Sequence, residues 1–116
     1  MARQAAERSG RDAETRAAAW LEKQDWICLA KRVKTPRGEV DLIMRRGSVV
    51  AFVEVKWRVK ADELDHAIDE RRLQRVAAAA ECIAHEFLGE KDDMRIDVIL
   101  LAPGTAPRHI VNAWQP

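Results

Sequence analysis

The chain has 116 residues, of which 47% are hydrophobic and 34% are charged, a balance typical of a single soluble globular domain. Its formal net charge of +1 excludes the strongly basic class of nucleic-acid-binding proteins, and no apolar stretch approaches the ~20 residues that a membrane-spanning helix needs. The polar N-terminal residues lack the apolar segment of a secretory signal. Cys28 and Cys82 lie far apart, as reduced thiols often do. We therefore expect a cytoplasmic protein that does not associate with a membrane.

The first half of the chain predicts a tail, a helix and three strands. Residues 1–10 are polar and are expected to form a flexible tail, which leaves residues 11–116 as a single domain. Apolar side chains recur at helical spacing in residues 11–26, which predicts the first helix. Strands are predicted where apolar residues alternate with polar ones or form a continuous run, at residues 26–33, 39–45 and 49–57.

The second half begins with a charged segment, residues 58–65, which has few apolar residues and is expected to be a mobile loop. Helical spacing predicts a long helix over residues 66–88, which ends at Gly89. A strand is predicted over residues 94–102, and a short final strand is possible at 109–114. The order α-β-β-β-α-β predicts an α/β fold in which helices pack on the faces of a sheet.

The hydrophobic core is expected to form around the third predicted strand, which is almost entirely apolar. Its expected members are Leu42, Phe52, Val53, Val55, Ile68, Val76, Ile83, Val98 and Leu100. The three histidines are not spaced as a metal cluster, and they are expected at the surface or at helix ends.

Four charged residues interrupt the two central strands. Glu39 and Asp41 share one face of the second strand, and Glu54 and Lys56 share one face of the third, because side chains alternate along a strand. The loop between these strands decides whether the two pairs meet.

A hairpin closed by Arg45 and Ser48 would place Glu39 directly opposite Glu54 and bring all four charged side chains to one face. A slip of one residue would send the two pairs to opposite faces. The hairpin therefore predicts a shared patch only if its loop has an even number of residues.

Three carboxylates in one patch repel each other unless positive charge lies between them. Lys56 can neutralise one carboxylate, and a divalent cation can neutralise the others, since Mg²⁺ prefers oxygen ligands. Such an ion can activate water and stabilise charge on a scissile phosphate, while Lys56 orients the attacking water or offsets developing charge. Spacing alone favours the alternative, a partly exposed Glu54–Lys56 ion pair on a solvated sheet face that has no catalytic role.

The stretch RGEVDLIMRRGSVVAFVEVKWR, residues 37–58, resembles the signature of the YraN-like family of bacterial proteins, which are grouped with predicted endonucleases. The resemblance covers nearly the whole chain, including GRDAETRAAAWLEKQDWICLAKRVK near the start, RIDVILL and HIVNAW. It implies a restriction-endonuclease-like fold, with a mixed sheet and a site of the PD-(D/E)xK type.

Residue by residue, the resemblance implies a catalytic and metal-binding site. Asp41 matches the metal-binding aspartate, and Glu54 and Lys56 match the acidic residue and the lysine of the (D/E)xK half. Glu39 matches the glutamate of the GE-x-D signature and is a further catalytic candidate. Glu14 matches a first-helix glutamate that can reach the metal. The implied metal set is Asp41, Glu54 and Glu14, with Mg²⁺ or Mn²⁺ as the cofactor.

The sequence departs from the family pattern at three positions. Ala13 stands where glycine is usual, Trp57 replaces a smaller residue, and Arg72 occupies a position that is usually lysine. Arginine can still bind phosphate, and can do so through two parallel hydrogen bonds.

Basic residues are concentrated in residues 1–60, which hold 14 Lys and Arg against 8 Asp and Glu. Contacts with a nucleic-acid backbone are predicted for Lys34, Arg37, Arg45, Arg58 and Arg72. Lysines on an edge strand also protect it from aggregation, which is an alternative role for part of this set. Arg71 and Arg75 are expected to pair with acidic residues along their helix.

Together these features predict a nucleic-acid-binding protein that cleaves phosphodiesters with Mg²⁺ or Mn²⁺. DNA, or a branched recombination intermediate, is the expected substrate. Nucleases of this fold often act as dimers, so a homodimer is possible. Two alternatives stay open: a nucleic-acid-binding module without hydrolysis, and an accessory module of the same fold that recruits a protein partner.

Overall fold

The computed structural model describes the backbone of residues 2–114 and the side chains of residues 12–114. Its elements, in chain order, are α1 (Ala2–Glu22), β1 (Ile27–Thr35), β2 (Gly38–Arg46), β3 (Val49–Trp57), the 3-10 helix η1 (Ala61–His66), α2 (Glu70–Phe87), β4 (Asp93–Leu101) and β5 (Arg108–Ile110). The predicted α/β order is confirmed, and the possible final strand is present.

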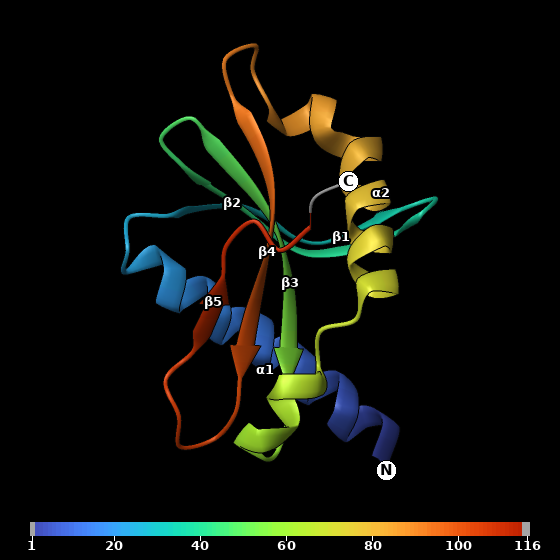
Figure 1. Ribbon diagram of the computed structural model, residues 1–116, viewed down its shortest axis with the longest axis vertical. Helices are drawn as coiled ribbons and strands as arrows, with labels where there is room; N and C mark the ends of the chain where they lie inside the picture. The colour runs from blue at the N-terminus through green and yellow to red at the C-terminus, as the bar shows by residue number, and fades with distance from the viewer. Residues whose placement is uncertain (1, 115–116) are drawn as a thin grey trace.

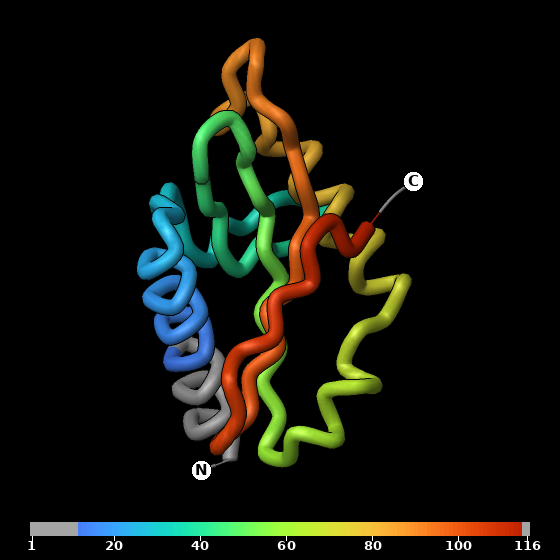
Figure 2. The backbone as a smooth tube through the Cα atoms, turned by 60° about the vertical axis from the view of Figure 1, so that its left-hand side comes forward, coloured from blue at the N-terminus to red at the C-terminus, as the bar shows by residue number. Residues whose placement is uncertain are grey.

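The five strands form one mixed sheet in the order β1-β2-β3-β4-β5. Only the β3–β4 pair is parallel, because α2 carries the chain back across the sheet between these two strands. The two long helices lie on opposite sides of the sheet, α1 on one side and α2 on the other, as the two views in Figures 1 and 2 show. The fold therefore has three layers.

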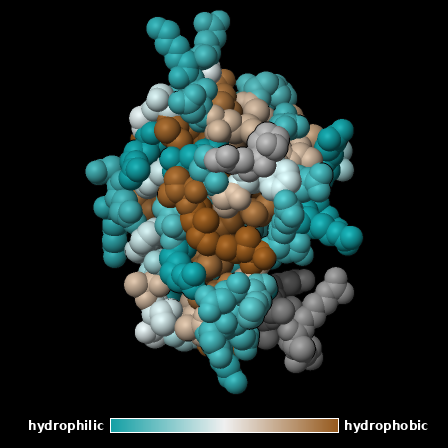
Figure 3. Space-filling model, viewed as in Figure 1, coloured by the Kyte–Doolittle hydropathy of each residue, from teal (hydrophilic) through white to brown (hydrophobic). Residues whose placement is uncertain are grey.

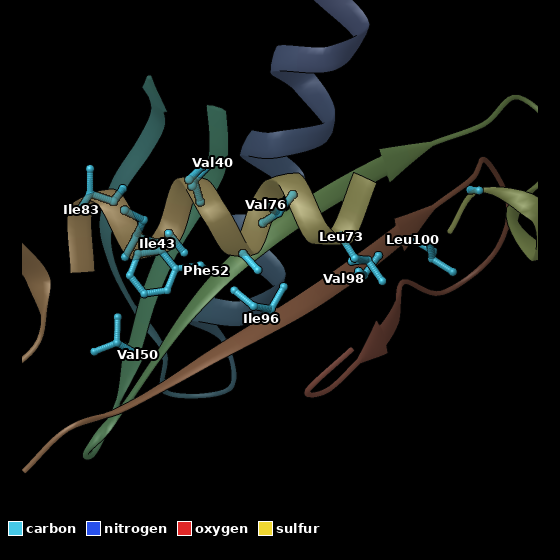
Figure 4. Close-up of a cluster of buried hydrophobic side chains, with 14 of the residues drawn as sticks. Val40, Ile43, Val50, Phe52, Leu73, Val76, Ile83, Ile96, Val98 and Leu100 are labelled. Carbon is cyan, nitrogen blue, oxygen red and sulfur yellow. The ribbon is translucent and has the colours of Figure 1, made fainter. Parts of the chain in front are cut away.

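Each face of the sheet has its own hydrophobic core. Phe52 points toward α2, where it packs with Val76 and Ile83 (Figure 4). Val53, the next residue on β3, points toward α1 and packs with Leu21. Because both faces of β3 are buried, the prediction that this strand is central is confirmed.

Most of the predicted core residues are buried: Leu42, Phe52, Val53, Val76, Ile83, Val98 and Leu100. Val55 is partly buried against the α1 side. The prediction for Ile68 is wrong, since its side chain is 38% exposed. Asp69 caps α2 by accepting a hydrogen bond from the backbone N–H of Arg71 at 2.9 Å, so the helix begins after Ile68 and does not direct that side chain to the core.

The segment over residues 58–65, predicted to be a loop, is partly helical. It contains most of η1, and Leu64 is only 2% exposed within the core on the α2 side. This single leucine packs the charged segment against the sheet. Composition did not predict the contact, because the segment as a whole has few apolar residues.

Helix α1 begins at Ala2, before the predicted start at residue 11. The side chains of residues 1–11 lie outside the part that the structure describes, so the flexible tail at residues 1–10 stays a prediction. No helix in the described part of the chain is long and apolar enough to cross a membrane. Cys28 and Cys82 are both free thiols.

The hairpin between β2 and β3 has a two-residue turn, Gly47 and Ser48, closed by Arg46 and Val49. Gly47 has a φ of 62°, which glycine adopts readily at the first position of such a turn. The predicted register, with Arg45 opposite Ser48, is therefore wrong by two residues. An even shift leaves the paired residues Leu42–Arg46 on their predicted faces. Alternation is interrupted at Asp41, since Val40 packs in the core on the α2 side and Leu42 in the core on the α1 side. Glu39, Asp41 and Glu54 nevertheless line one cavity, as predicted.

The homodimer stays a prediction, because the structure describes one chain. On the face drawn in Figure 3, hydrophilic side chains surround a hydrophobic area between α2 and β5. An area of this kind is one surface that a partner could cover.

Candidate metal and phosphate site

Three carboxylates from two elements meet at one edge of the central sheet. Glu14 from α1, and Glu39 and Asp41 from β2, each offer an oxygen, and these oxygens all lie within 4.8 Å of one another. Small buried residues on α1, Ala13 and Ala17, let the helix approach the sheet closely enough for Glu14 to reach it. The three oxygens form a ligand group that suits a hard divalent cation.

Asp41 lies where the backbone pairing of β2 with β3 ends. The described register stops at Leu42 and Val53, and beyond it Asp41 Oδ2 accepts a hydrogen bond from the Val55 backbone N–H at 2.8 Å. A side chain thus takes the place of a backbone acceptor. This bond fixes the Asp41 carboxylate against β3, beside Glu54.

Glu54 is almost fully buried, with 3% of its surface exposed, and two cations neutralise it. Its Oε1 accepts a hydrogen bond from Arg72 Nε at 2.7 Å and lies 3.3 Å from Lys56 Nζ. Lys56 follows Glu54 by two residues on β3, as predicted from alternation, whereas Arg72 comes from the first turns of α2. The protein therefore supplies the counter-charge of Glu54 itself.

A cavity of about 320 Å³ opens between the sheet and α2 at this site. Its lining residues are Gly38, Glu39, Asp41, Glu54, Arg72, Arg75 and Val76. This volume holds several water molecules. Carboxylates line its sheet side and arginines line its helix side, an arrangement that suits a phosphate group bound through a cation on one side and guanidinium groups on the other.

The surroundings of the site shift the pKa of Asp41 and the pKa of Lys56. Burial and the neighbouring Glu54 carboxylate raise the pKa of Asp41 from 3.8 to about 7, and Glu14 and Glu39 contribute further. Burial lowers the pKa of the Lys56 ammonium, although the attraction of Glu54 opposes this shift. Both shifts are typical of ionisable groups that are grouped in a site for chemistry or ion binding.

Arg32 on β1 is a neighbour of the carboxylates that the sequence did not identify. Its Nη1 lies 3.6 Å from Glu14 Oε2, and its Nε lies 4.0 Å from Glu39 Oε1. The backbone of Arg32 has a φ of 53°, an uncommon conformation for arginine. Strand alternation therefore could not predict the direction of the Arg32 side chain.

The structure brings all five predicted catalytic and metal residues to one region, but it divides them into two groups. Glu14, Glu39 and Asp41 form the carboxylate group that could hold a cation, whereas Glu54 and Lys56 form an ion pair with Arg72. The predicted metal set contained Glu54 in place of Glu39. The geometry favours Glu39 as the third oxygen ligand.

The residues predicted to contact a nucleic-acid phosphate lie in several parts of the structure. Arg72 lines the cavity, and Arg37 lies near it in the turn between β1 and β2. Lys34 is exposed on β1. Arg58 is half-buried after β3 and donates to the backbone carbonyl of Trp57 at 2.8 Å.

Arg45 is held at the other end of β2. Its Nη2 lies 2.6 Å from Asp92 Oδ2, and it also donates to the backbone carbonyl of Phe87. These contacts hold the β2–β3 hairpin against the end of α2. Arg45 therefore lies apart from the candidate phosphate-binding surface.

A family model with the description "Uncharacterised protein family UPF0102" matches residues 13–101, which include every residue of the carboxylate group. A relative from Erythrobacter litoralis, named "UPF0102 protein", is 69% identical over 116 residues and covers both chains completely. Another from Sphingopyxis alaskensis is 58% identical over the whole of both chains. A relative named "UPF0102 protein RPA0323", from Rhodopseudomonas palustris strain CGA009, is 44% identical over 98% of this chain and 88% of its own.

Proposed function

Because the chain belongs to the Uncharacterised protein family UPF0102, whose description names no activity, we propose a function from the site itself. We propose that the protein binds nucleic acid and hydrolyses a phosphodiester bond with Mg²⁺ or Mn²⁺. The expected substrate is DNA, in duplex or branched form. The observation that carries this proposal is the convergence of Glu14, Glu39 and Asp41 beside a cavity that also contains arginine side chains.

The carboxylate group fits a divalent cation in both geometry and charge. Three oxygens within 4.8 Å of one another leave room for water and a phosphate oxygen to complete the coordination of Mg²⁺. The raised pKa of Asp41 means that the site holds its negative charge at a cost, which a cation would remove. When bound, the cation supplies positive charge that polarises a phosphate oxygen and favours deprotonation of water.

Lys56 and Arg72 would act on the reacting phosphate. Glu54 positions both cations through contacts of 3.3 Å and 2.7 Å. In this arrangement Lys56 orients the attacking water or offsets charge in the transition state, and Arg72 binds a phosphate oxygen. Glu54 itself is then a positioning residue, because its carboxylate is engaged by these two side chains.

The restriction-endonuclease-like fold is the finer part of the proposal. A mixed sheet in which an antiparallel hairpin joins a parallel β3–β4 pair, with a helix on each face, agrees with the fold that the sequence resemblance implies. A fold alone does not establish an activity, so the proposal depends on the side chains of the site.

The test is cleavage of a panel of labelled nucleic acids: single-stranded, duplex and branched DNA, and matching RNA. The wild-type protein should cut at least one member with Mg²⁺ or Mn²⁺ and none with chelator. Asp41→Asn should abolish cleavage, and Lys56→Ala should lower the rate by about 10²–10³-fold, as loss of a charge-stabilising group typically does. The matched control is Glu81→Gln on the exposed side of α2, which should cut like the wild type.

One observation favours a second function, a nucleic-acid-binding module without hydrolysis. The carboxylate of Glu54, which the sequence assigned to the metal, is engaged by Lys56 and Arg72. Such a module would bind nucleic acid equally well with chelator and would cut no member of the panel. If the protein neither binds nor cuts nucleic acid, the remaining function is that of an accessory module that binds a protein partner.

A further inference from the structure

A second hollow adjoins the cavity at the carboxylates. It has a volume of about 390 Å³ and is lined by Arg37, Arg71, Gln74, Arg75 and Ala78. Arg37 comes from the turn between β1 and β2, and the other four lie along the exposed side of α2. Arg75 lines both hollows, so the two lie next to each other at this side chain.

Three arginine side chains line this hollow. Within the described part of the chain, no acidic side chain pairs with Arg37, Arg71 or Arg75. The predicted pairing of Arg71 and Arg75 along the helix is therefore wrong. Like charges at one hollow repel each other, and a bound anion would relieve that repulsion.

The spacing of these groups suits a phosphate backbone. Arg71 and Arg75 are four residues apart on α2, so they lie on the same side of the helix about 6 Å apart along its axis. Guanidinium groups bind phosphate oxygens through two parallel hydrogen bonds. Gln74, between them in sequence, adds an amide that can reach a sugar or a phosphate. Among the residues that the structure describes, none with an aromatic side chain lines the hollow, so these residues offer no surface for base stacking.

We propose that this hollow is a phosphate subsite, formed by Arg37, Arg71 and Arg75, that binds the nucleic-acid backbone next to the phosphate at the carboxylates. The proposal rests on the proposed function, since both hollows then hold one strand. The strand runs from the carboxylates along α2 toward the turn between β1 and β2. Binding here depends on neither metal nor base sequence, and a substrate must extend beyond the cleaved bond on this side.

The experiment measures binding of a labelled single-stranded oligonucleotide by fluorescence anisotropy, in chelator, over a series of salt concentrations. Arg71→Ala/Arg75→Ala should bind about tenfold or more weakly at low salt. The slope of log affinity against log salt should become shallower by about 1.4, since each lost contact to a single strand removes about 0.7. Arg71→Lys/Arg75→Lys should keep the slope and lose part of the affinity, because lysine is a point charge.

The matched control is Arg16→Ala, which removes an exposed arginine from α1 on the opposite face of the sheet and should leave affinity and slope unchanged. Thermal melting of each variant checks that it folds, as expected for exposed residues without carboxylate partners.

The outcomes separate this proposal from the proposed function. If the wild type binds and Arg71→Ala/Arg75→Ala binds equally well with the same slope, the subsite is wrong and the proposed function stands. If the wild type binds no nucleic acid at any salt concentration, both are overturned.

Discussion

Asp41 and Val55 are joined by a hydrogen bond in which the backbone N–H of Val55 donates to Asp41 Oδ2 at 2.8 Å. The bond closes the ladder between β2 and β3 with a side chain, at the point where the described backbone pairing ends. It also holds the Asp41 carboxylate in a buried position beside Glu54, where burial and the Glu54 charge raise the pKa of Asp41 to about 7. Ionisation of Asp41 therefore lowers the stability of the folded protein, and this effect can be measured without any ligand.

The first prediction concerns stability against pH in the metal-free protein. The pKa of Asp41 is about 7 when folded, against 3.8 as its ordinary value, so the folded state holds a proton that the unfolded state has lost. Stability is fully present below about pH 4 and is lost as the pH rises through about 7. The slope is up to about 1.4 kcal/mol per pH unit. Urea unfolding in chelator across this range measures it.

Asp41→Asn is the comparison for that experiment. The asparagine keeps an oxygen that can accept from Val55 but cannot ionise, so this contribution to the slope should disappear and the variant should be more stable than the wild type at neutral pH. Groups that do not interact with Asp41 affect both proteins equally and cancel in the difference, whereas Glu54, Glu14 and Glu39 interact with Asp41 and contribute to that difference. Identical profiles for the two proteins would show that Asp41 titrates normally.

Strand alternation predicted that Asp41 and Glu54 lie together, and both line one cavity, although the alternation is interrupted between Val40 and Leu42, which pack on opposite sides of the sheet. The predicted hairpin register was wrong by two residues, yet an even error moves no side chain to the other face. The order of elements followed from apolar periodicity for the same reason: local patterns of period two and 3.6 survive small errors at element boundaries.

Contacts between distant elements could not be predicted in this way. Arg72 reaches Glu54 from α2, and Arg32 reaches Glu14 across two layers, and no local pattern states how a helix sits over a particular strand. His109, expected at the surface or a helix end, has a side chain only 14% exposed, because it contacts the buried carboxylate of Asp97. These misses share one cause, which is tertiary placement.

The second prediction is that Mn²⁺ stabilises the fold. A ligand that binds only the folded state at 100 times its dissociation constant adds about 2.7 kcal/mol, which raises the melting temperature by roughly 10 °C in a domain of this size. Glu39→Gln should remove most of this shift, because Glu39 offers one of the three oxygens of the proposed metal site. Glu81→Gln, an exposed carboxylate on α2, should retain it.

Glu54→Gln tests whether Glu54 is a metal ligand or acts only through its ion pairs with Lys56 and Arg72. If Glu54 acts through Lys56 and Arg72, its amide variant should keep a Mn²⁺-dependent shift, although it lowers the stability of the metal-free protein. Complete loss of the shift would place Glu54 among the ligands, as the sequence resemblance implied. A wild-type melting temperature that does not respond to Mn²⁺ would contradict the metal site altogether.

The third prediction concerns Asp97, a fully buried carboxylate on β4. It accepts hydrogen bonds from both Arg95 Nε and Nη2, at 2.9 and 2.8 Å, from the Asn112 backbone N–H at 2.9 Å, and lies 2.8 Å from His109 Nε2. Although burial alone would raise its pKa, these hydrogen bonds outweigh burial and the pKa of Asp97 is lowered. Asp97 thus ties the C-terminal segment to the sheet.

Asp97→Ala should lower the free energy of unfolding by about 3–5 kcal/mol, since it leaves charged partners in a buried place without their carboxylate. Asp97→Asn keeps the shape and part of the hydrogen bonding, so its loss should be smaller. Urea unfolding measures both variants. Equal stability of Asp97→Ala and the wild type would mean that the C-terminal segment is held by other contacts.

The last prediction concerns Leu64, the buried residue of η1. Its side chain is 2% exposed and packs in the core on the α2 side, in a segment whose composition otherwise predicts a mobile loop. Leu64→Ala should lower the free energy of unfolding by about 2–5 kcal/mol. Val59→Ala, five residues earlier and 64% exposed, should change it by no more than about 0.5 kcal/mol. Because this segment joins Lys56 on β3 to Arg72 on α2, Leu64→Ala should also speed amide hydrogen exchange from Val59 to His66. Equal effects of the two substitutions on stability would mean that the segment is mobile and that Leu64 contributes nothing to the core.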